Sequence, residues 1–388
     1  MDFGEAPEQQ AIRDAVRGLC ARYPGAYWRD LDRRSAYPEE FVRALTEAGW
    51  LGALIPAEFG GGGLGLAEAA AILEEINASG GNAASAHAQM YTMGTLLRHG
   101  SDAQKKRVLP RLASGELRLQ AFGITEPDAG SETTRIRTIA QRRGSGYVVN
   151  GKKIFISRAL QSDLLLLLAR TTPFDAVEDK TKGLSVFLVD LKAAVANKQI
   201  TIRPIETMLN HHTTELFIDG LELAADDLVG TEGEGFRHII DSWNAERILI
   251  ASESLGDGRW FVEQAVAYAS KRVVFARPIG ANQGVQFPIA QAHAQLVAAG
   301  LARDKAAWLF DNGTPSGAEA NMAKLLASQA AWSAGNAAMD AYGGYAYATE
   351  FDVERKFRET RLYLTAPVSN NLVLAYIAEH VLGLPRSY

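Results

Sequence analysis

The chain has 388 residues, of which 47% are hydrophobic and 22% charged, and its formal net charge is -5. This composition is typical of a soluble globular protein, and the length suggests roughly two or three domains of ~150 residues each. The mild acidity argues against a nucleic-acid-binding surface, and the longest apolar runs, Leu164 to Ala169 and Leu372 to Ala378, are far shorter than the ~20 residues that span a bilayer.

The first expected helix contains Ile12, Val16, Leu19 and Cys20 at the spacing of one helical face. Cys20 is the one cysteine of the chain, so no internal disulfide can form, and its place in this apolar pattern predicts a small buried side chain rather than a nucleophile. The first residues show neither the basic region nor the apolar core of a secretory signal. We therefore expect a cytoplasmic protein in a reducing compartment.

Residues 1–118 are predicted to form an N-terminal helical domain. Further helices are expected from Pro38 to Gly49, from Leu66 to Ala78 and from Ala103 to Leu109. In the last of these, Asp102 is the expected N-cap, and Pro110 should end or kink the helix.

A glycine-rich segment, 60–65, formally contains the GxGxxG pattern of a dinucleotide-binding loop. Such a loop requires a strand before it and a βαβ unit around it, whereas here helices surround it and Pro56 precedes it. The pattern therefore favours a flexible turn over a phosphate cradle.

Residues 119–232 are predicted to form a middle, antiparallel β-domain. Tyr147 to Val149 and Ile154 to Ile156 flank Asn150-Gly151, a strong hairpin signal. Further strands are expected at 164–169, 184–189, 200–205 and 214–218. The polar stretch from Thr171 to Lys182 lies between two of them and is expected to be a loop or disordered.

Residues 233–388 return to helical periodicity. Long helices are expected at 236–270, 286–311, 316–341 and 368–382. Long helices that short loops join favour a C-terminal helical bundle. The predicted fold class is therefore a multidomain α+β chain with a helical, a β and a second helical domain.

Two motifs in the middle domain are the most informative. The segment 122–132 reads FGITEPDAGSE and offers hydroxyls and backbone N–H groups to an anion or a heterocycle edge. The segment 150–157 reads NGKKIFIS. Together they resemble the acyl-CoA dehydrogenase family, a family of flavoproteins, and the resemblance covers essentially the whole chain. It extends to Pro56–Gly61, to Arg272–Phe275 with Gln283, and to Tyr342–Gly344 with the charged pairs at 354–355 and 358–359.

The resemblance implies FAD as the cofactor and assigns roles to residues of the middle domain. Ile124 and Thr125 would line the pyrimidine edge of the flavin, and Ser131 would meet the pyrophosphate or groups of the coenzyme A substrate. Phe155 would cover one flavin face, and Ser157 would hydrogen-bond flavin N5. The remaining implied cofactor contacts are Phe122, Gly130, Ser369 and Asn371.

A second set of implied contacts belongs to the FAD of a neighbouring subunit. It comprises Arg272, Phe275, Gln283, Gly343 and Gly344. Sharing of this kind implies a homo-oligomer, and a homotetramer is the habit of the family. The chain departs mildly from the family pattern at Ala276, Glu132 and Asp340, where Gly, Asp and Gln are usual.

The resemblance also implies the reaction, which is α,β-dehydrogenation of an acyl thioester. A carboxylate removes the α-proton, and the β-hydride passes to flavin N5. The usual late position of this carboxylate holds Pro367 here, so the usual base is absent. Isovaleryl- and long-chain-type members carry the base before an Arg on the first long C-terminal helix, and that pair here is Glu246-Arg247, with Arg247 as a substrate contact.

The helical pattern supports Glu246 independently. At ~100° per residue, Ile239, Trp243, Glu246 and Ile250 fall on one stripe. A carboxylate in an apolar stripe is costly unless it is paired or protonated, and burial raises its pKa towards a range useful to a base. The alternative is a buried Glu paired with a structural Arg or a backbone group.

Pro367 has a second consequence. In the family, the backbone N–H at this position donates to the thioester carbonyl, and proline has no N–H. Losing such a donor can cost several kcal/mol of transition-state stabilisation. Another donor could compensate, the loop could be shifted by a residue, or the protein could be slow or perform different chemistry.

Three functions therefore remain open. The leading one is a dehydrogenase that acts on an acyl-CoA or on an acyl group of a carrier protein, with an electron-transfer flavoprotein as acceptor. The second is a flavin-dependent oxidase or monooxygenase on the same fold. The third is a binding protein without turnover. No metal is expected, because His211 and His212 have no partner at ligand spacing.

Overall fold

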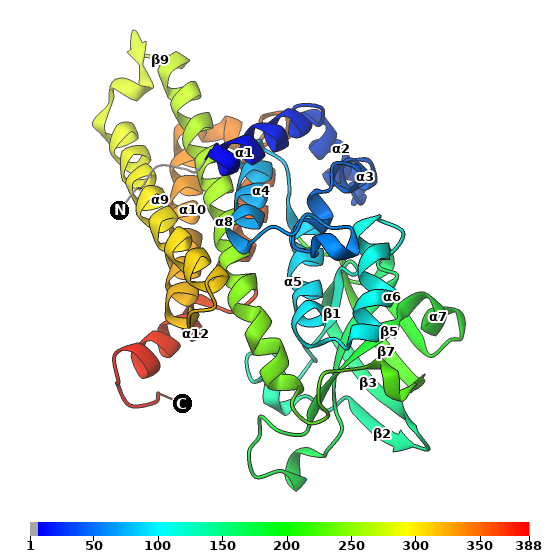
Figure 1. Cartoon of the computed structure of the whole chain (residues 1–388). Coiled ribbons are helices and arrows are strands. Elements are labelled where there is room, and N and C mark those ends of the chain that lie inside the picture. The colour runs from blue at the N-terminus through cyan, green and yellow to red at the C-terminus, as the bar shows by residue number, and fades with distance from the viewer. Residues whose placement is uncertain (1–6, 388) are drawn as a thin grey trace.

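The computed structural model describes residues 7–387. The expected lack of a secretory signal concerns the first residues of the chain, of which residues 1–6 lie outside the described part. The N-terminal third is helical, as predicted (Figure 1). Its helices are α1 (Pro7–Cys20), α2 (Gly25–Arg34), α3 (Glu39–Glu47), α4 (Leu66–Ala78), α5 (Ala84–His99) and α6 (Asp102–Ala113).

The predicted cap of α6 is wrong by one residue. Ser101 is the N-cap, and its hydroxyl accepts from the Gln104 backbone N–H while the Gln104 side chain accepts from the Ser101 N–H. This reciprocal capping box satisfies two backbone donors at once, which a cap at Asp102 would not do. Pro110 does not end the helix, which continues for one further turn to Ala113.

The glycine-rich segment 60–65 is a tight turn. The N–H groups of Gly62 and Gly63 donate to the carbonyls of Gly52 and Ile55. A Cβ at Gly61 would lie 2.2 Å from the carbonyl oxygen of Ile55. Because these amides are used within the turn, they are not free to hold a phosphate, and the turn interpretation is confirmed.

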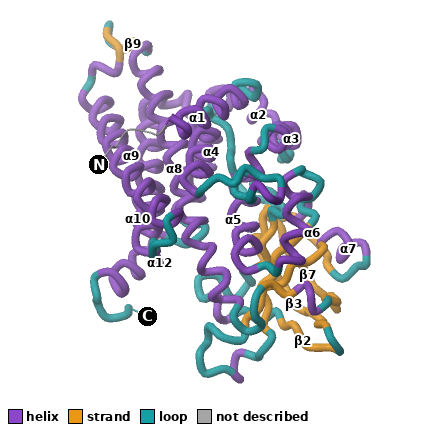
Figure 2. The backbone as a smooth tube through the Cα atoms, viewed as in Figure 1, coloured by secondary structure: helices purple, strands orange, loops and turns teal. Residues whose placement is uncertain are grey.

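A single eight-stranded sheet forms the middle of the chain (Figure 2). The strand order is β6-β7-β3-β2-β4-β5-β8, with β1 paired to β4 in parallel. All other pairings are antiparallel except one parallel contact between β2 and β4. The strands are β1 (Ala121–Gly123), β2 (Ile139–Arg143), β3 (Gly146–Ser157), β4 (Leu164–Arg170), β5 (Leu184–Asp190), β6 (Ile200–Pro204), β7 (Thr213–Leu223) and β8 (Leu228–Val229), and the short helix α7 (Leu191–Ala196) follows β5.

The hairpin predicted at Asn150-Gly151 is wrong. These residues lie inside β3, and the turn instead joins β2 to β3 between Arg143 and Gly146. Asn150 supports the strand, because its side-chain oxygen accepts from the N–H of Gly220 in β7. Gly151 permits a close approach, since a Cβ there would lie 2.3 Å from the Thr138 hydroxyl. The loop 171–182 is confirmed and contains one short helical turn, Phe174–Ala176.

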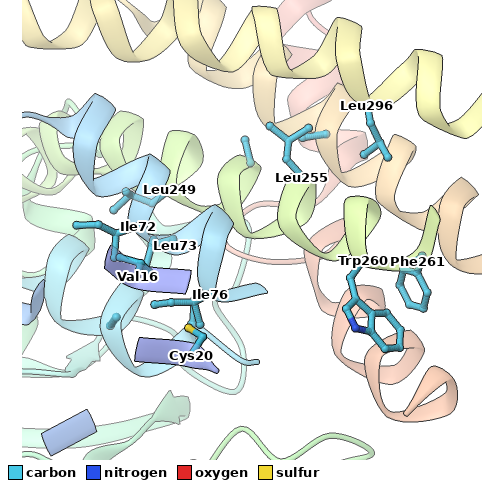
Figure 3. Close-up of a cluster of buried hydrophobic side chains, with 14 of the residues drawn as sticks. Val16, Cys20, Ile72, Leu73, Ile76, Leu249, Leu255, Trp260, Phe261 and Leu296 are labelled. Atoms are coloured by element: carbon cyan, nitrogen blue, oxygen red, sulfur yellow. The ribbon is translucent and has the colours of Figure 1, made fainter. Parts of the chain in front are cut away.

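The last third is a bundle of long helices. It contains α8 (Gly235–Lys271), α9 (Gln283–Asp311), α10 (Gly317–Tyr342), α11 (Val353–Arg361) and α12 (Asn370–Tyr376), with the small hairpin β9 (Val273–Val274) and β10 (Arg277–Pro278) at one end. In α8, Leu249 faces Ile72 and Leu73 of α4, and Leu255 lies near Leu296 of α9 (Figure 3). Helix α8 therefore connects the two helical parts of the molecule through one core.

The predicted domain boundaries fall between elements. Helix α6 ends at Ala113 before β1 begins, and β8 ends at Val229 before α8 begins at Gly235. The division at 118 and 232 stays a prediction. No helix of residues 7–387 combines the length and apolar character that crossing a bilayer requires.

Candidate active site

A buried ion pair holds the two motifs of the middle domain together. Lys153 of β3 donates to the Ile124 carbonyl at 3.0 Å and to the Glu126 carboxylate at 2.8 Å. Glu126 also accepts from the backbone N–H groups of Arg137 and Thr138. Burial lowers the pKa of Lys153 to about 8, although the Glu126 charge opposes this shift. The loop after β1 is thereby fixed against β3.

Beside the Lys153–Glu126 ion pair, an exposed aromatic ring lies close to polar groups. The register of β3 shifts between Lys153 and Ile156, and Phe155 adopts a left-handed φ of 57° with 63% of its surface exposed. Thr125 lies beside this segment, because the Ile154 N–H donates to its carbonyl at 2.9 Å, and Ile124, Thr125 and Ser157 are half-buried. A large apolar side chain that a strained backbone presents to solvent is a feature of binding sites rather than of cores.

The loop after β1 has backbone that is open to solvent at Gly130 and Ser131. A Cβ added at Gly130 would have no atom within 4 Å, and Ser131 is exposed. Phe122 differs from these residues, since it is buried and stacks on Tyr91 with ring centroids 6.4 Å apart. We therefore interpret Phe122 as a wall of the site behind Ile124 rather than as an exposed contact.

Glu246 lies on α8 at the edge of the same region. Its side chain is buried, with 8% of the residue exposed, and it has no hydrogen bond or ion pair within residues 7–387. Ile239 and Ile250 are buried on the same stripe, and Trp243 packs into one apolar cluster with Phe122, Ile124 and Tyr91. Burial raises the pKa of Glu246 to about 7, and the His87 and Arg247 charges only partly oppose it.

The alternative of a Glu246 paired with a structural Arg finds no contact to support it. Arg247 instead donates to the side chain of Asn244 at 3.1 Å, and its Nε is buried without a partner. Burial lowers the pKa of Arg247, while Glu246 and Tyr376 oppose the shift. The Glu246 carboxylate is thus an unpaired buried group with a pKa near neutral pH, where a base can both accept and release a proton.

Sequence reasoning missed two residues beside Glu246. His87 and Tyr91 lie on α5, and their rings are in contact with centroids 5.2 Å apart. Burial raises the pKa of Tyr91, and the Glu246 charge raises it further. Helix α5 is buried on most of its surface, so it has no polar and apolar faces for a periodic pattern to reveal.

The residues assigned to a neighbouring subunit lie at the other end of the bundle. Arg272 follows α8, about 39 Å along the helix from Glu246 at 1.5 Å per residue. Arg272, Gly343 and Gly344 line one cavity of about 570 Å³. Phe275 is 96% exposed at the tip of the β9–β10 hairpin, and Gln283 is the first residue of α9. Within one chain, this group does not meet Glu246.

The last predicted cofactor contacts form a third group. Ser369 and Asn371 line a cavity of about 670 Å³ together with Trp332, Arg361 and others. Ser369 also caps α12, because its hydroxyl accepts from the Leu372 N–H. Within residues 7–387, no three His, Cys, Asp or Glu side chains gather as metal ligands would.

Comparison with known proteins covers nearly the whole chain. Family models match residues 6–116 as the acyl-CoA dehydrogenase N-terminal domain, 121–221 as the middle domain and 233–382 as the C-terminal domain. An acyl-CoA dehydrogenase of Mycobacterium tuberculosis is 37% identical over 100% of this chain and 99% of its own length. A glutaryl-CoA dehydrogenase of Desulfococcus multivorans is 33% identical over 100% of both chains.

Solved structures agree in fold. A glutaryl-coenzyme A dehydrogenase in complex with glutaryl-CoA superposes with a TM-score of 0.92 and 32% identity, over 100% of this chain and 98% of that one. The butyryl-CoA dehydrogenase of Megasphaera elsdenii gives a TM-score of 0.91 with 26% identity, over 98% and 100%. The predicted order of helical, β and helical parts is confirmed by these likenesses.

Proposed function

Because the chain belongs to the acyl-CoA dehydrogenase family, we propose that it dehydrogenates an acyl-CoA between its α- and β-carbons, with Glu246 as the base. The observation that carries the assignment of the base is the buried, unpaired state of Glu246 beside the apolar cluster of Trp243 and Tyr91. There it takes the α-proton of the bound thioester on a carboxylate oxygen. Its raised pKa lets it hold that proton at neutral pH.

FAD is the cofactor of the family, and the residues of the middle domain fit it. The exposed Phe155 ring offers an apolar face, Thr125 and Ser157 offer hydroxyls, and the open backbone at Gly130 leaves room for a large group. FAD supplies the acceptor for the hydride that leaves the β-carbon. The chain's own residues bind and orient the ring, exclude water and move the α-proton.

The position where most of the family carries the base supports the same assignment. Residues 362–372 contain no Asp or Glu, and Pro367 occupies the usual site. Pro367 has no N–H to offer the thioester carbonyl, so we expect another group to donate there. Glu246 is the buried, unpaired carboxylate on the helix where isovaleryl- and long-chain-type members carry theirs.

The alternative of an oxygen-reacting or carrier-protein-linked enzyme is not favoured. A prolyl acyl carrier protein oxidase has a similar structure, with a TM-score of 0.90, but it is only 25% identical to this chain. The relatives above 30% identity include those named for acyl-CoA and glutaryl-CoA dehydrogenation. These names differ in the acyl group, so they do not decide which acyl group this chain accepts.

Partners and assembly belong to the same proposal. We expect an electron-transfer flavoprotein to reoxidise the flavin. Sharing of FAD by two subunits is supported by the distance between Glu246 and the group around Arg272, because residues so far apart in one chain do not meet at one FAD, and a homotetramer is the assembly that we propose from the habit of the family. A cytoplasmic location is supported by the cysteine content, since Cys20 is buried and alone.

The test is anaerobic mixing of the FAD-loaded protein with a panel of acyl-CoAs. Loss of the oxidised flavin absorbance, with an enoyl-CoA as product, supports the proposal. A flavin that no acyl-CoA reduces contradicts it. Steady turnover with oxygen as the sole acceptor, producing peroxide, would favour the oxidase instead.

A further inference from the structure

A buried group of polar side chains lies beside Glu246 and is not used by the proposed chemistry. It comprises His87 of α5, Arg158 after β3, Glu253 of α8 and Tyr363 after α11, and we call it the polar floor. His87 Nδ1 lies 2.6 Å from the Glu253 carboxylate, and the Tyr363 hydroxyl donates to the same carboxylate at 3.3 Å. Four separate elements thus bring charged and polar groups to one buried place.

Arg158 is the unusual member of the polar floor. Only 3% of it is exposed, and its side chain contacts neutral partners, the Ser85 hydroxyl at 3.3 Å and His211 Nδ1 at 3.5 Å. Within residues 7–387 it has no carboxylate within 4 Å. Burial lowers the pKa of Arg158, but a guanidinium remains a cation.

Three arginines of the described chain that are buried as deeply as Arg158, each less than 5% exposed, have several partners each. Arg303 donates to the Glu74 carboxylate at 2.8 Å, and Arg355 donates to Glu359 at 2.9 Å. Arg170 donates to four backbone carbonyls. A buried charge without such partners is costly, so its retention at Arg158 indicates a partner that the chain itself does not supply.

His87 presents a second unused group at the same place. Its Nε2 is buried and has no hydrogen-bond partner, while its Nδ1 is held by Glu253. Burial lowers the pKa of His211 well below its usual value, and the Arg158 charge adds to this, so His211 is a neutral neighbour. The Glu253 charge raises the pKa of Arg158, but the contact of Glu253 is with His87, so no carboxylate of the described residues binds the guanidinium directly.

The polar floor lies within reach of a molecule bound at Glu246. The His87 charge acts on Glu246, and the Tyr91 hydroxyl is close enough to feel the charges of both Glu246 and Arg158. Glu253 lies on the same helix as Glu246, two turns or about 10 Å further along. Because His87 and Tyr91 are neighbours of both Glu246 and the polar floor, we place the acyl chain of a thioester held at Glu246 against the polar floor.

We propose that Arg158 and His87 receive a carboxylate at the far end of the acyl chain, so that the substrate is the coenzyme A thioester of a short dicarboxylic acid. This inference rests on the proposed function. A carboxylate would accept charge-assisted hydrogen bonds from the guanidinium, which are the strongest kind that Arg makes. A plain alkyl end would leave both the guanidinium and His87 Nε2 buried and unsatisfied.

The test compares thioesters of equal chain length. The FAD-loaded full chain is mixed anaerobically with glutaryl-CoA or pentanoyl-CoA, and with adipyl-CoA or hexanoyl-CoA, and half-saturation of flavin reduction is measured. We expect the carboxylated member of a pair to saturate at a concentration at least ~10-fold lower. In Arg158→Met this preference should disappear or reverse, while Arg203→Met, which changes an exposed arginine of β6, should keep it.

Equal or better reduction by the straight-chain thioesters overturns the inference, and so does a better response to a neutral hydroxyl-ended thioester. If no thioester reduces the flavin, the proposed function fails, and calorimetric binding of the same pairs then decides the inference separately. Tighter binding of glutaryl-CoA than of pentanoyl-CoA would support the carboxylate site, and equal binding would refute it. The wild-type comparison decides the matter even if Arg158→Met does not fold.

Discussion

At the scale of single residues, Glu246 differs from the other buried carboxylates of residues 7–387 in having no hydrogen bond or ion pair. Glu74 is bound by Arg303, and Asp257 is paired with Lys356. The apolar stripe predicted this burial from the sequence, and the vacancy at Pro367 predicted the role. The electrostatic surroundings could not be predicted, because His87, Tyr91 and Arg158 come from distant parts of the chain.

The raised pKa of Glu246 should appear as a pH-dependent stability. The carboxyl has a pKa of about 7 in the fold against 4.5 in the unfolded chain, so the native state binds more protons between these values and loses stability as the pH rises through them. Glu246→Gln removes this loss. Its stability relative to the parent should therefore increase by about 2–3 kcal/mol from pH 5 to pH 8, as chemical denaturation of both proteins would measure.

The matched control is Glu263→Gln, an exposed carboxylate on the same helix. It should show no such change with pH. A stability difference between Glu246→Gln and the parent that is constant from pH 5 to pH 8 would contradict the raised pKa.

The rate of flavin reduction should depend on the protonation state of Glu246. Only the deprotonated carboxylate can remove the α-proton, so the rate at low thioester concentration should be level above pH ~7 and fall about tenfold per pH unit below it. Anaerobic stopped-flow absorbance measures this profile. A rate that is independent of pH between 5 and 8 speaks against Glu246 as the base.

At the scale of elements, the sequence predicted the long helices and most strands, but it misplaced one turn. Asn150-Gly151 resembles a hairpin turn locally, yet β3 continues through it because β7 supplies a partner for Asn150 and Thr138 packs on Gly151. Tertiary contacts of this kind override a local signal. Helix α5 was missed for a related reason, since burial on most sides removes the periodic pattern.

Gly151→Ala tests this reading of β3. The new methyl group would lie 2.3 Å from the Thr138 hydroxyl and 2.7 Å from the Thr138 Cα. Strand β3 and the segment that leads into β2 would therefore have to move apart. We expect a destabilisation of about 1–3 kcal/mol by thermal or chemical denaturation. Gly284→Ala in α9, where no atom lies within 4 Å, serves as the control and should not destabilise the protein. Equal stability of both variants would mean that Gly151 is not closely packed.

At the scale of the whole molecule, α8 relates the three parts of the chain. Its first half carries Glu246 beside the sheet, its middle packs on α4, and its end carries Arg272 and the β9–β10 hairpin (Figure 1). The sequence motifs allowed the family and the order of the helical, β and helical parts to be predicted. Because we propose that two subunits share FAD, the shape of its site would depend on a second copy of the chain and could not be predicted from one sequence.

Phe275→Ala tests the sharing of FAD between subunits. The side chain is almost fully exposed, so its removal should change the stability of the single chain by no more than about 0.5 kcal/mol. If it covers the cofactor of a neighbour, the variant should lose FAD, as the ratio of flavin to protein after gel filtration would show. Val266→Ala, an exposed apolar residue of α8, should retain FAD like the parent. Full FAD retention in Phe275→Ala would exclude this contact.

The most direct test of the whole account is the anaerobic reaction of FAD-loaded Glu246→Gln with an acyl-CoA that reduces the parent protein. We predict that the thioester still binds and perturbs the flavin spectrum, while the rate of flavin reduction falls by at least about 10²–10⁴-fold, because no group remains to take the α-proton. Reduction of the flavin at the parental rate would show that another residue is the base.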